Sequence, residues 1–154
     1  MDNPKICLPA GKAGNSKIRD NRILRVIDAN CNRALEGLRV CEEITRFVLC
    51  DPRLTRALKE IRHNVVGAIA RWKVTKASLL GSRNSEQDVG KPSLEDELKR
   101  HGHKDIFYAN MQRAKESVRV LEECAKLSHK KVSGVFKNIR YTLYAIEKKT
   151  HPKL

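Results

Sequence analysis

The chain has 154 residues, of which 40% are apolar and 5% aromatic, and it carries a formal net charge of +14. A chain of this length suits one domain that buries roughly two-thirds of its unfolded surface. It holds no run of about 18 apolar residues and no apolar signal-peptide segment, so we expect no membrane span and a cytoplasmic location. Its five cysteines are odd in number and form no CxxC pair, which favours reduced, structural thiols.

The chain begins with a segment that lacks any regular pattern. Residues 1–19 combine prolines, glycines and basic residues without periodicity, which predicts a flexible basic tail before a single helical domain at 20–150. Apolar residues then recur at helical spacing as far as Leu49. We therefore predict one helix of about 28 residues, with Asp20 or Asn21 at its N-cap.

Three further helices follow from the same kind of pattern. Pro52, directly after Asp51, is typical of the first turn of a second helix, which ends near residue 72. Apolar spacing predicts two more helices, at about 105–127 and 131–149.

An inserted segment at about 78–102 separates the two halves. Gly81 and Gly90 bracket a polar loop, and Ser93 with Asp96 resembles a capping box that opens a short extra helix. Loops of this length inside a compact domain are more often functional than idle, although a plain connector is the alternative.

Two segments 80 residues apart repeat each other. Residues 29–43 and 109–123 are identical at nine of fifteen positions, where average composition gives about one by chance. We infer a duplicated helical hairpin, with halves at about 20–72 and 104–149, and predict an all-α, four-helix bundle-like fold with a pseudo-two-fold axis. The shared polar residues are Asn30/Asn110, Arg33/Arg113, Glu36/Glu116, Arg39/Arg119, Glu42/Glu122 and Glu43/Glu123.

Helical angles divide these shared residues into two sets. At 100° per residue, Asn30 lies in the middle of the apolar face of the first helix, with Arg33 and Glu36 along one edge. The second copy repeats this arrangement, so we expect the two sets to converge and form an anion site with carboxylates for Mg²⁺. The alternative is that these arginines and glutamates pair within each helix and fix its register. The shared residues expected on the opposite side are Arg39, Arg119, Glu42 and Glu122.

The inserted loop offers further groups for an anion. Arg83, Asn84 and Asp88 stand beside Gly90, a set suited to phosphate and a metal ion. No GxxxxGK[ST], GxGxxG or zinc-type spacing accompanies them. The basic excess leaves a helical RNA-binding protein as an alternative, although the stacking aromatics and glycine loops of common RNA modules are missing.

Several motifs, taken in order, resemble one small protein family. They are Arg22-Ile-Leu-Arg-Val-Ile-Asp-Ala-Asn, Leu58-Lys-x-Ile-Arg-His63, Ser82-Arg-Asn-Ser-x-x-Asp-Val-Gly90 and Ile139-Arg-Tyr-x-Leu-Tyr144, together with the repeated segments. Over residues 20–149 the chain looks like the all-helical hydroxymethylpyrimidine phosphate kinases of thiamin biosynthesis. Members of that family are often fused ahead of thiamin phosphate synthase and named for it. The resemblance implies phosphorylation of 4-amino-5-hydroxymethyl-2-methylpyrimidine phosphate to its diphosphate, with ATP as donor and Mg²⁺ as cofactor.

We assign residue roles in such a site as hypotheses. The residues expected at the reacting phosphates are Arg33, Arg83, Asp88 and Arg113. Those expected on Mg²⁺ are Glu36, Asp88 and Glu116. Those expected to bind the substrate, with the asparagines at its aminopyrimidine edge, are Asn30, Asn110, Gly90, Arg62 and Arg140.

The resemblance also bears on partners. Besides its two phosphorylated ligands, the chain is expected to have a thiamin phosphate synthase domain or a second copy of itself as possible partners. The main alternative to a kinase is a non-catalytic ligand-binding or docking module for that synthase. No synthase domain follows Leu154, so we expect either a free-standing chain or a piece of such a fusion.

Overall fold

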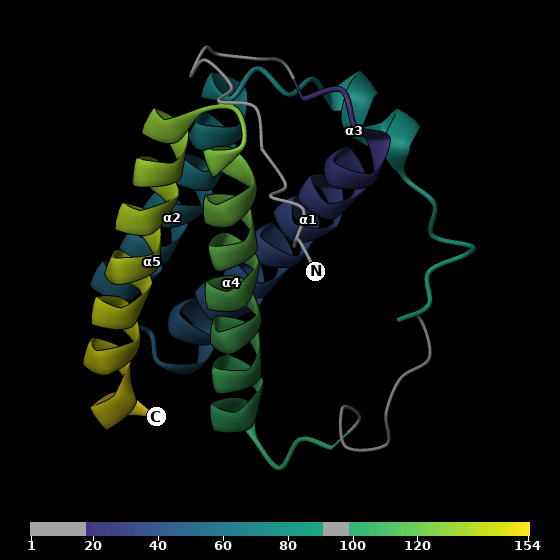
Figure 1. The fold of residues 1–154 in the computed structure, drawn as a ribbon. Coiled ribbons are helices and arrows are strands. Elements are labelled where there is room, and N and C mark those ends of the chain that lie inside the picture. Colours follow the sequence, from purple (N-terminus) through teal and green to yellow (C-terminus); the bar gives the residue numbers. More distant parts are fainter. Residues whose placement is uncertain (1–17, 91–98) are drawn as a thin grey trace, which may run out of the picture.

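The computed structural model describes residues 18–90 and 99–154, and in these ranges every regular element is a helix. The all-α prediction is therefore confirmed. None of the described helices is long and apolar enough to cross a membrane. The helices are α1 (Asn21–Glu43), α2 (Pro52–Arg71), α3 (Lys76–Ser82), α4 (His103–Lys126) and α5 (Lys130–Thr150), with a π-helical turn η1 (Ile44–Val48) and a 3₁₀ turn η3 (His151–Lys153) (Figure 1).

The first two helices begin at capping residues that the sequence identified. The Asp20 carboxylate accepts the backbone N–H of Arg22 at 2.9 Å, and Asp51 accepts those of Arg53 and Leu54, each at 2.9 Å. Each cap satisfies donors that the first helical turn leaves without partners. The expected 28-residue helix is α1 extended by η1, whose wider turn ends the regular α-helical bonding.

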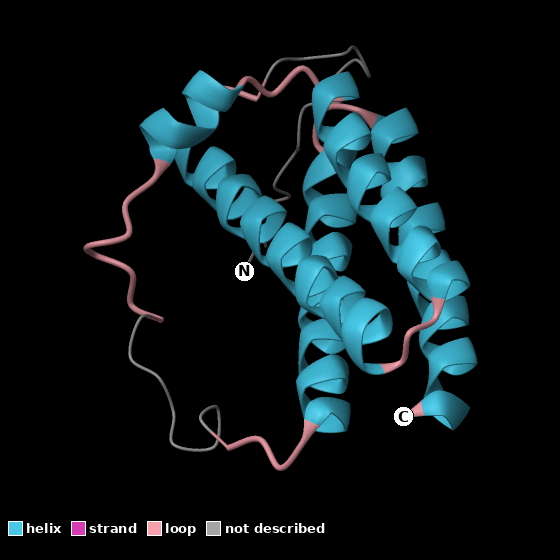
Figure 2. Ribbon diagram, turned by 180° about the vertical axis from the view of Figure 1, so that it is seen from behind, coloured by secondary structure: helices cyan, strands magenta, loops and turns pink. Residues whose placement is uncertain are grey.

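The four long helices close into a ring around one core. α1 packs against α2 and α4, and α5 packs against the same two helices, so that each hairpin contacts the other along both of its helices. The largest fully buried side chains come from all four helices. Figures 1 and 2 show α1 crossing α4 obliquely, with the two helices running in opposite directions.

The crossing of α1 and α4 is close because a glycine lies there. A Cβ built on Gly37 would lie 2.7 Å from the backbone oxygen of Asn110 and 3.4 Å from the nitrogen of Ala114. No larger residue fits at that position without moving one helix. The position equivalent to Gly37 in the second copy holds Ser117, which is also buried.

The inserted segment is partly helical where a loop was predicted. Residues 76–82, which overlap the predicted loop, form α3, capped by Thr75 through the N–H of Ser78 at 3.1 Å. This helix packs on α1 and buries Leu79. The short helix predicted from Ser93 to about Arg100 falls mostly in 91–98, and the predicted tail almost wholly in 1–17, both outside the described residues; the described end of that helix, at Lys99 and Arg100, is not helical.

Candidate functional site on the outer face of the α1/α4 crossing

Each hairpin is braced by a buried glutamate between two arginines. The Glu42 carboxylate of α1 accepts a hydrogen bond from Arg39 at 3.3 Å and another from Arg62 of α2 at 3.1 Å. The second hairpin repeats the arrangement, with Glu122 bound by Arg119 at 3.2 Å and by Arg140 of α5 at 3.0 Å. Both carboxylates are 4% exposed. A buried carboxylate that receives two guanidinium groups ties its two helices together.

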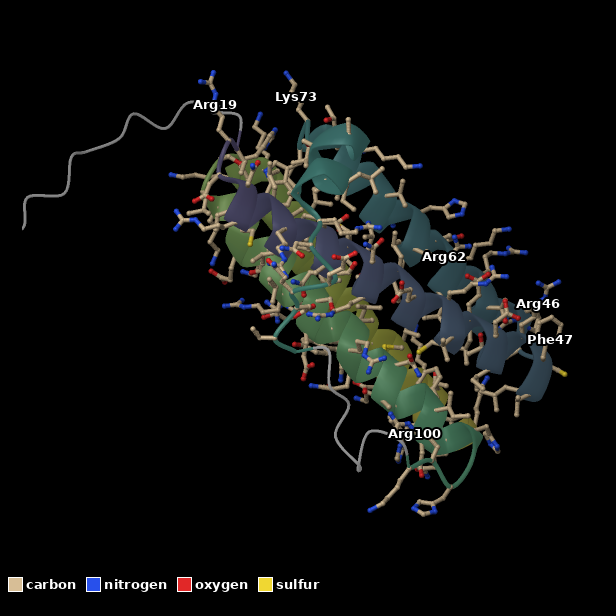
Figure 3. All side chains as sticks on the ribbon, turned by 90° about the vertical axis from the view of Figure 1, so that its right-hand side faces the viewer. Arg19, Arg46, Phe47, Arg62, Lys73 and Arg100 are labelled. Carbon is tan, nitrogen blue, oxygen red and sulfur yellow. The ribbon has the colours of Figure 1, made fainter. Side chains whose placement is uncertain are left out.

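These clusters correct part of the sequence interpretation. Glu42 and Glu122, expected on the side of their helices away from the pocket, lie buried between the helices of their hairpins. Arg62, labelled in Figure 3, and Arg140 were expected to bind the substrate but hold these carboxylates. A register-fixing arginine–glutamate lattice therefore exists, but Arg33 takes no part in it.

Arg33 and Arg113 lie on the side of their helices opposite to these clusters. Nine residues separate Arg33 from Glu42 and Arg113 from Glu122, which at 100° per residue is half a turn. Since α2 and α5 pack on each other, both arginines point away from them, onto the outer face of the α1/α4 pair. Both are exposed, and neither has a hydrogen bond or ion pair with any described residue.

The two asparagines lie at opposite ends of this crossing. Asn30 is 8% exposed and donates its Nδ2 hydrogen to the carbonyl of Val26 at 2.8 Å, and Asn110 makes the equivalent bond to Ile106 at 2.8 Å. Asn110 lies level with Gly37, which is seven residues, or about 10 Å, from Asn30 along α1. The asparagines thus do not converge as expected. The matching contacts agree with the duplication, while the two-fold axis itself stays a prediction.

The loop after α3 is anchored to α1 at Asp28, two residues before Asn30 and about 160° around the helix from it. Arg83 forms a bidentate ion pair with Asp28, with N–O distances of 2.7 and 2.8 Å, and this hydrogen bonding raises the pKa of Arg83. Arg25 donates to the backbone oxygen of Asn84 at 2.6 Å. Arg83, expected at a phosphate, already has a carboxylate partner. The sequence interpretation did not include Asp28, although its burial beside the apolar face of α1 marks it as a residue that needs a cation.

The same loop folds on itself through two side chains. Asn84 Oδ1 accepts the N–H of Gln87 at 3.2 Å, and Asp88 Oδ1 accepts the N–H of Gly90 at 3.0 Å. Such local bonds fix a turn without help from the rest of the domain. The second carboxylate oxygen of Asp88 is left without a partner among the described residues.

The three carboxylates expected on Mg²⁺ come from separate elements. Glu36 is exposed on α1, Asp88 lies in the loop, and Glu116 on α4 accepts a hydrogen bond from Gln112 at 2.7 Å. Among the described residues no three His, Cys, Asp or Glu side chains gather into a metal-binding group. The face offers single carboxylates, which suits a Mg²⁺ ion held mainly by phosphate oxygens and water.

Three of the four cysteines in the described part of the chain are buried. Cys31 and Cys41 are buried, and burial raises the pKa of each thiol to about 12. The Cys41 thiol donates to the backbone oxygen of Phe107 on α4, with 3.5 Å between sulfur and oxygen. Cys50 is exposed in the turn between α1 and α2, where its φ is 50°.

Similarity to known proteins agrees with the motifs. The pattern of the ThiD2 family matches residues 25–149. A thiamine-phosphate synthase of Rhodopirellula baltica is 39% identical over 124 residues, which cover 80% of this chain and 32% of the relative. Those of Synechocystis sp. and Nostoc sp. are each 37% identical over 126 residues, covering 81% of this chain and 35% and 34% of the relatives. No solved structure shows significant similarity.

The chain thus spans about a third of the length of the curated relatives it matches. The family match falls within the span of residues 20–149 over which the motifs resemble a family of thiamin biosynthesis, and it is several times longer than any single motif. The chain belongs to the ThiD2 family.

Proposed function

We propose that this domain acts in thiamin biosynthesis as a hydroxymethylpyrimidine phosphate kinase, with its site on the outer face of α1 and α4. The observation that carries the proposal is the pair Arg33 and Arg113. They are exposed on one face of the α1/α4 crossing and have no partner among the described residues, while the other shared arginines are held by carboxylates. Free guanidinium groups held on rigid helices suit bidentate binding of phosphate.

The reaction requires two anions to be brought together. An oxygen of the pyrimidine monophosphate attacks the γ-phosphorus of ATP, a new P–O–P link forms, and the bond from the γ-phosphorus to the β-γ bridging oxygen breaks, so that ADP leaves with the electron pair. Positioning and charge stabilisation supply most of the catalysis in such transfers. In this proposal Arg33 and Arg113 neutralise the facing phosphates. Mg²⁺, when bound with the nucleotide, supplies further positive charge, and Asp88 or Glu36 is the carboxylate available to orient it.

The test is a coupled kinase assay on the full chain with ATP, Mg²⁺ and the pyrimidine monophosphate. We expect diphosphate product that depends on the pyrimidine, and a fall in kcat of about 100-fold in Arg33→Ala and in Arg113→Ala. The matched control is Arg71→Ala, which removes another exposed arginine, at the end of α2, and should leave turnover unchanged.

Two outcomes would contradict the proposal. Unchanged turnover in both arginine variants would remove the site from this face. Binding of the pyrimidine phosphate without formation of diphosphate would favour a non-catalytic module of thiamin phosphate synthase, an alternative in keeping with the share of the relatives that the chain spans.

A further inference from the structure

We infer that the α1/α4 crossing holds two equivalent base-reading half-sites, with the adenine of ATP at Asn30 and the substrate pyrimidine at Asn110. The inference rests on the proposed function and assigns a different ligand to each half of the duplication. It replaces the expectation that both asparagines read one pyrimidine.

The first step is the order of groups along the crossing. Asn30 and Asn110 lie about 10 Å apart along α1, and each is followed three residues later by an arginine that has no partner among the described residues and lies nearer the midpoint between the asparagines. Along the face the order is therefore amide, guanidinium, guanidinium, amide. Two ligands that each join a ring to phosphates match this order when their phosphates meet in the middle.

The second step is the hydrogen-bonding capacity left on each asparagine. One Nδ2 hydrogen is used by the carbonyl four residues earlier, and Oδ1 has no partner among the described residues. A carboxamide has one further N–H and a free carbonyl oxygen, which together fit a ring nitrogen beside an exocyclic amine. Adenine and 4-aminopyrimidine present that same edge, and an asparagine reads it in a bidentate manner on adenine bases.

The third step decides which ring lies where. The anchored loop, with Arg83 on Asp28 and an Asp88 oxygen that has no partner among the described residues, is attached to the N-terminal half of α1, two residues before Asn30. The positions in the second copy that correspond to Arg25 and Asp28 hold Asp105 and Tyr108, and the Tyr108 hydroxyl bonds His151. A triphosphate with its metal ion has more charge to accommodate than a monophosphate. The half that has Arg25 where the other has Asp105, together with the loop carboxylate for a metal ion, therefore suits ATP.

The test measures the binding of each ligand separately by calorimetry on the full chain. The probes are the β,γ-imido analogue of ATP with Mg²⁺, and the pyrimidine monophosphate alone. We expect Asn30→Ala to weaken the nucleotide analogue about tenfold or more with little effect on the pyrimidine, and Asn110→Ala to do the reverse. Asn64→Ala, an exposed asparagine on α2, is the control, and circular dichroism checks that each variant is folded.

A second measurement separates base reading from a structural role. Inosine triphosphate has an oxygen where adenine has the amine, so the wild type should discriminate against it and Asn30→Ala should lose that discrimination. Loss of affinity for the same ligand in both variants, or unchanged discrimination in Asn30→Ala, would overturn the two half-sites while leaving the kinase proposal intact. Failure of the wild type to bind either probe would instead overturn the kinase proposal, and the half-sites with it.

Discussion

Replacing Gly37 with alanine should destabilise the domain, although alanine is the better helix former. The added Cβ would lie 2.7 Å from the backbone oxygen of Asn110, where an ordinary contact begins at 3.4 Å, so the helices must separate by about 0.7 Å. Overpacking of this kind costs about 1–3 kcal/mol, and the gain in helix propensity returns about 1 kcal/mol. We expect a net loss of up to about 2 kcal/mol, or a fall in Tm of up to about 8 °C for a chain of this size.

The matched control is Gly134→Ala on α5, where the same added Cβ meets nothing within 4 Å. Only the propensity term applies there, so Tm should rise by about 2–4 °C. Urea unfolding followed by circular dichroism gives the free energy of unfolding of both variants. Shifts of the same sign in the two variants would refute the close crossing, because the chemical change is identical.

Three further outcomes follow from the contacts described above. Glu122→Gln leaves Arg140 facing a neutral amide in a buried position, so the free energy of unfolding should fall by about 2–3 kcal/mol. Urea titrations measure this change, and a loss below about 0.5 kcal/mol would show that the cluster does not stabilise the hairpin. Asp28→Asn should release the loop after α3, which hydrogen exchange would detect as faster exchange at residues 83–90, and unchanged exchange would remove Asp28 as its anchor. Iodoacetamide at about pH 8 should label Cys50 well before Cys41, since Cys41 is buried with a pKa raised to about 12, and equal rates by mass spectrometry would contradict that burial.

The helices were predictable because their signals are local. Apolar spacing and the capping residues Asp20 and Asp51 placed the starts of α1 and α2 within a residue or so. The helix at 76–82 was missed because its seven residues contain a glycine and two serines and bury one leucine, Leu79, against α1. Its formation depends on that tertiary contact, which no periodicity within so short a segment reveals.

The site was harder to predict because the roles of the shared residues depend on packing direction. Helical spacing gives α1 a single apolar face, but in the structure this helix contacts two neighbours, α2 and α4, on different sides. The side toward α2 carries Glu42, a charged residue whose burial depends on its ion pair with Arg62. The partners in this buried ion cluster are 20 residues apart, so no local sequence pattern marks them. An arginine that binds a buried glutamate therefore cannot be distinguished by sequence from an arginine that has no partner.

The duplication and the antiparallel crossing together explain why charge gathers in the middle of the outer face. When two copies of a helix cross in opposite directions near their centres, residues close to the centre of each copy come near one another, and residues farther out are carried apart. Since Gly37 lies level with Asn110, the antiparallel course places Arg113 about level with Ala34, next to Arg33, whereas the two asparagines lie about seven residues apart along α1. Two unpaired guanidinium groups near one crossing repel each other unless an anion lies between them. A phosphoryl group in transfer between two bound phosphates would bring the negative charge that offsets the two guanidinium groups. A single copy of the hairpin would supply only one of these arginines.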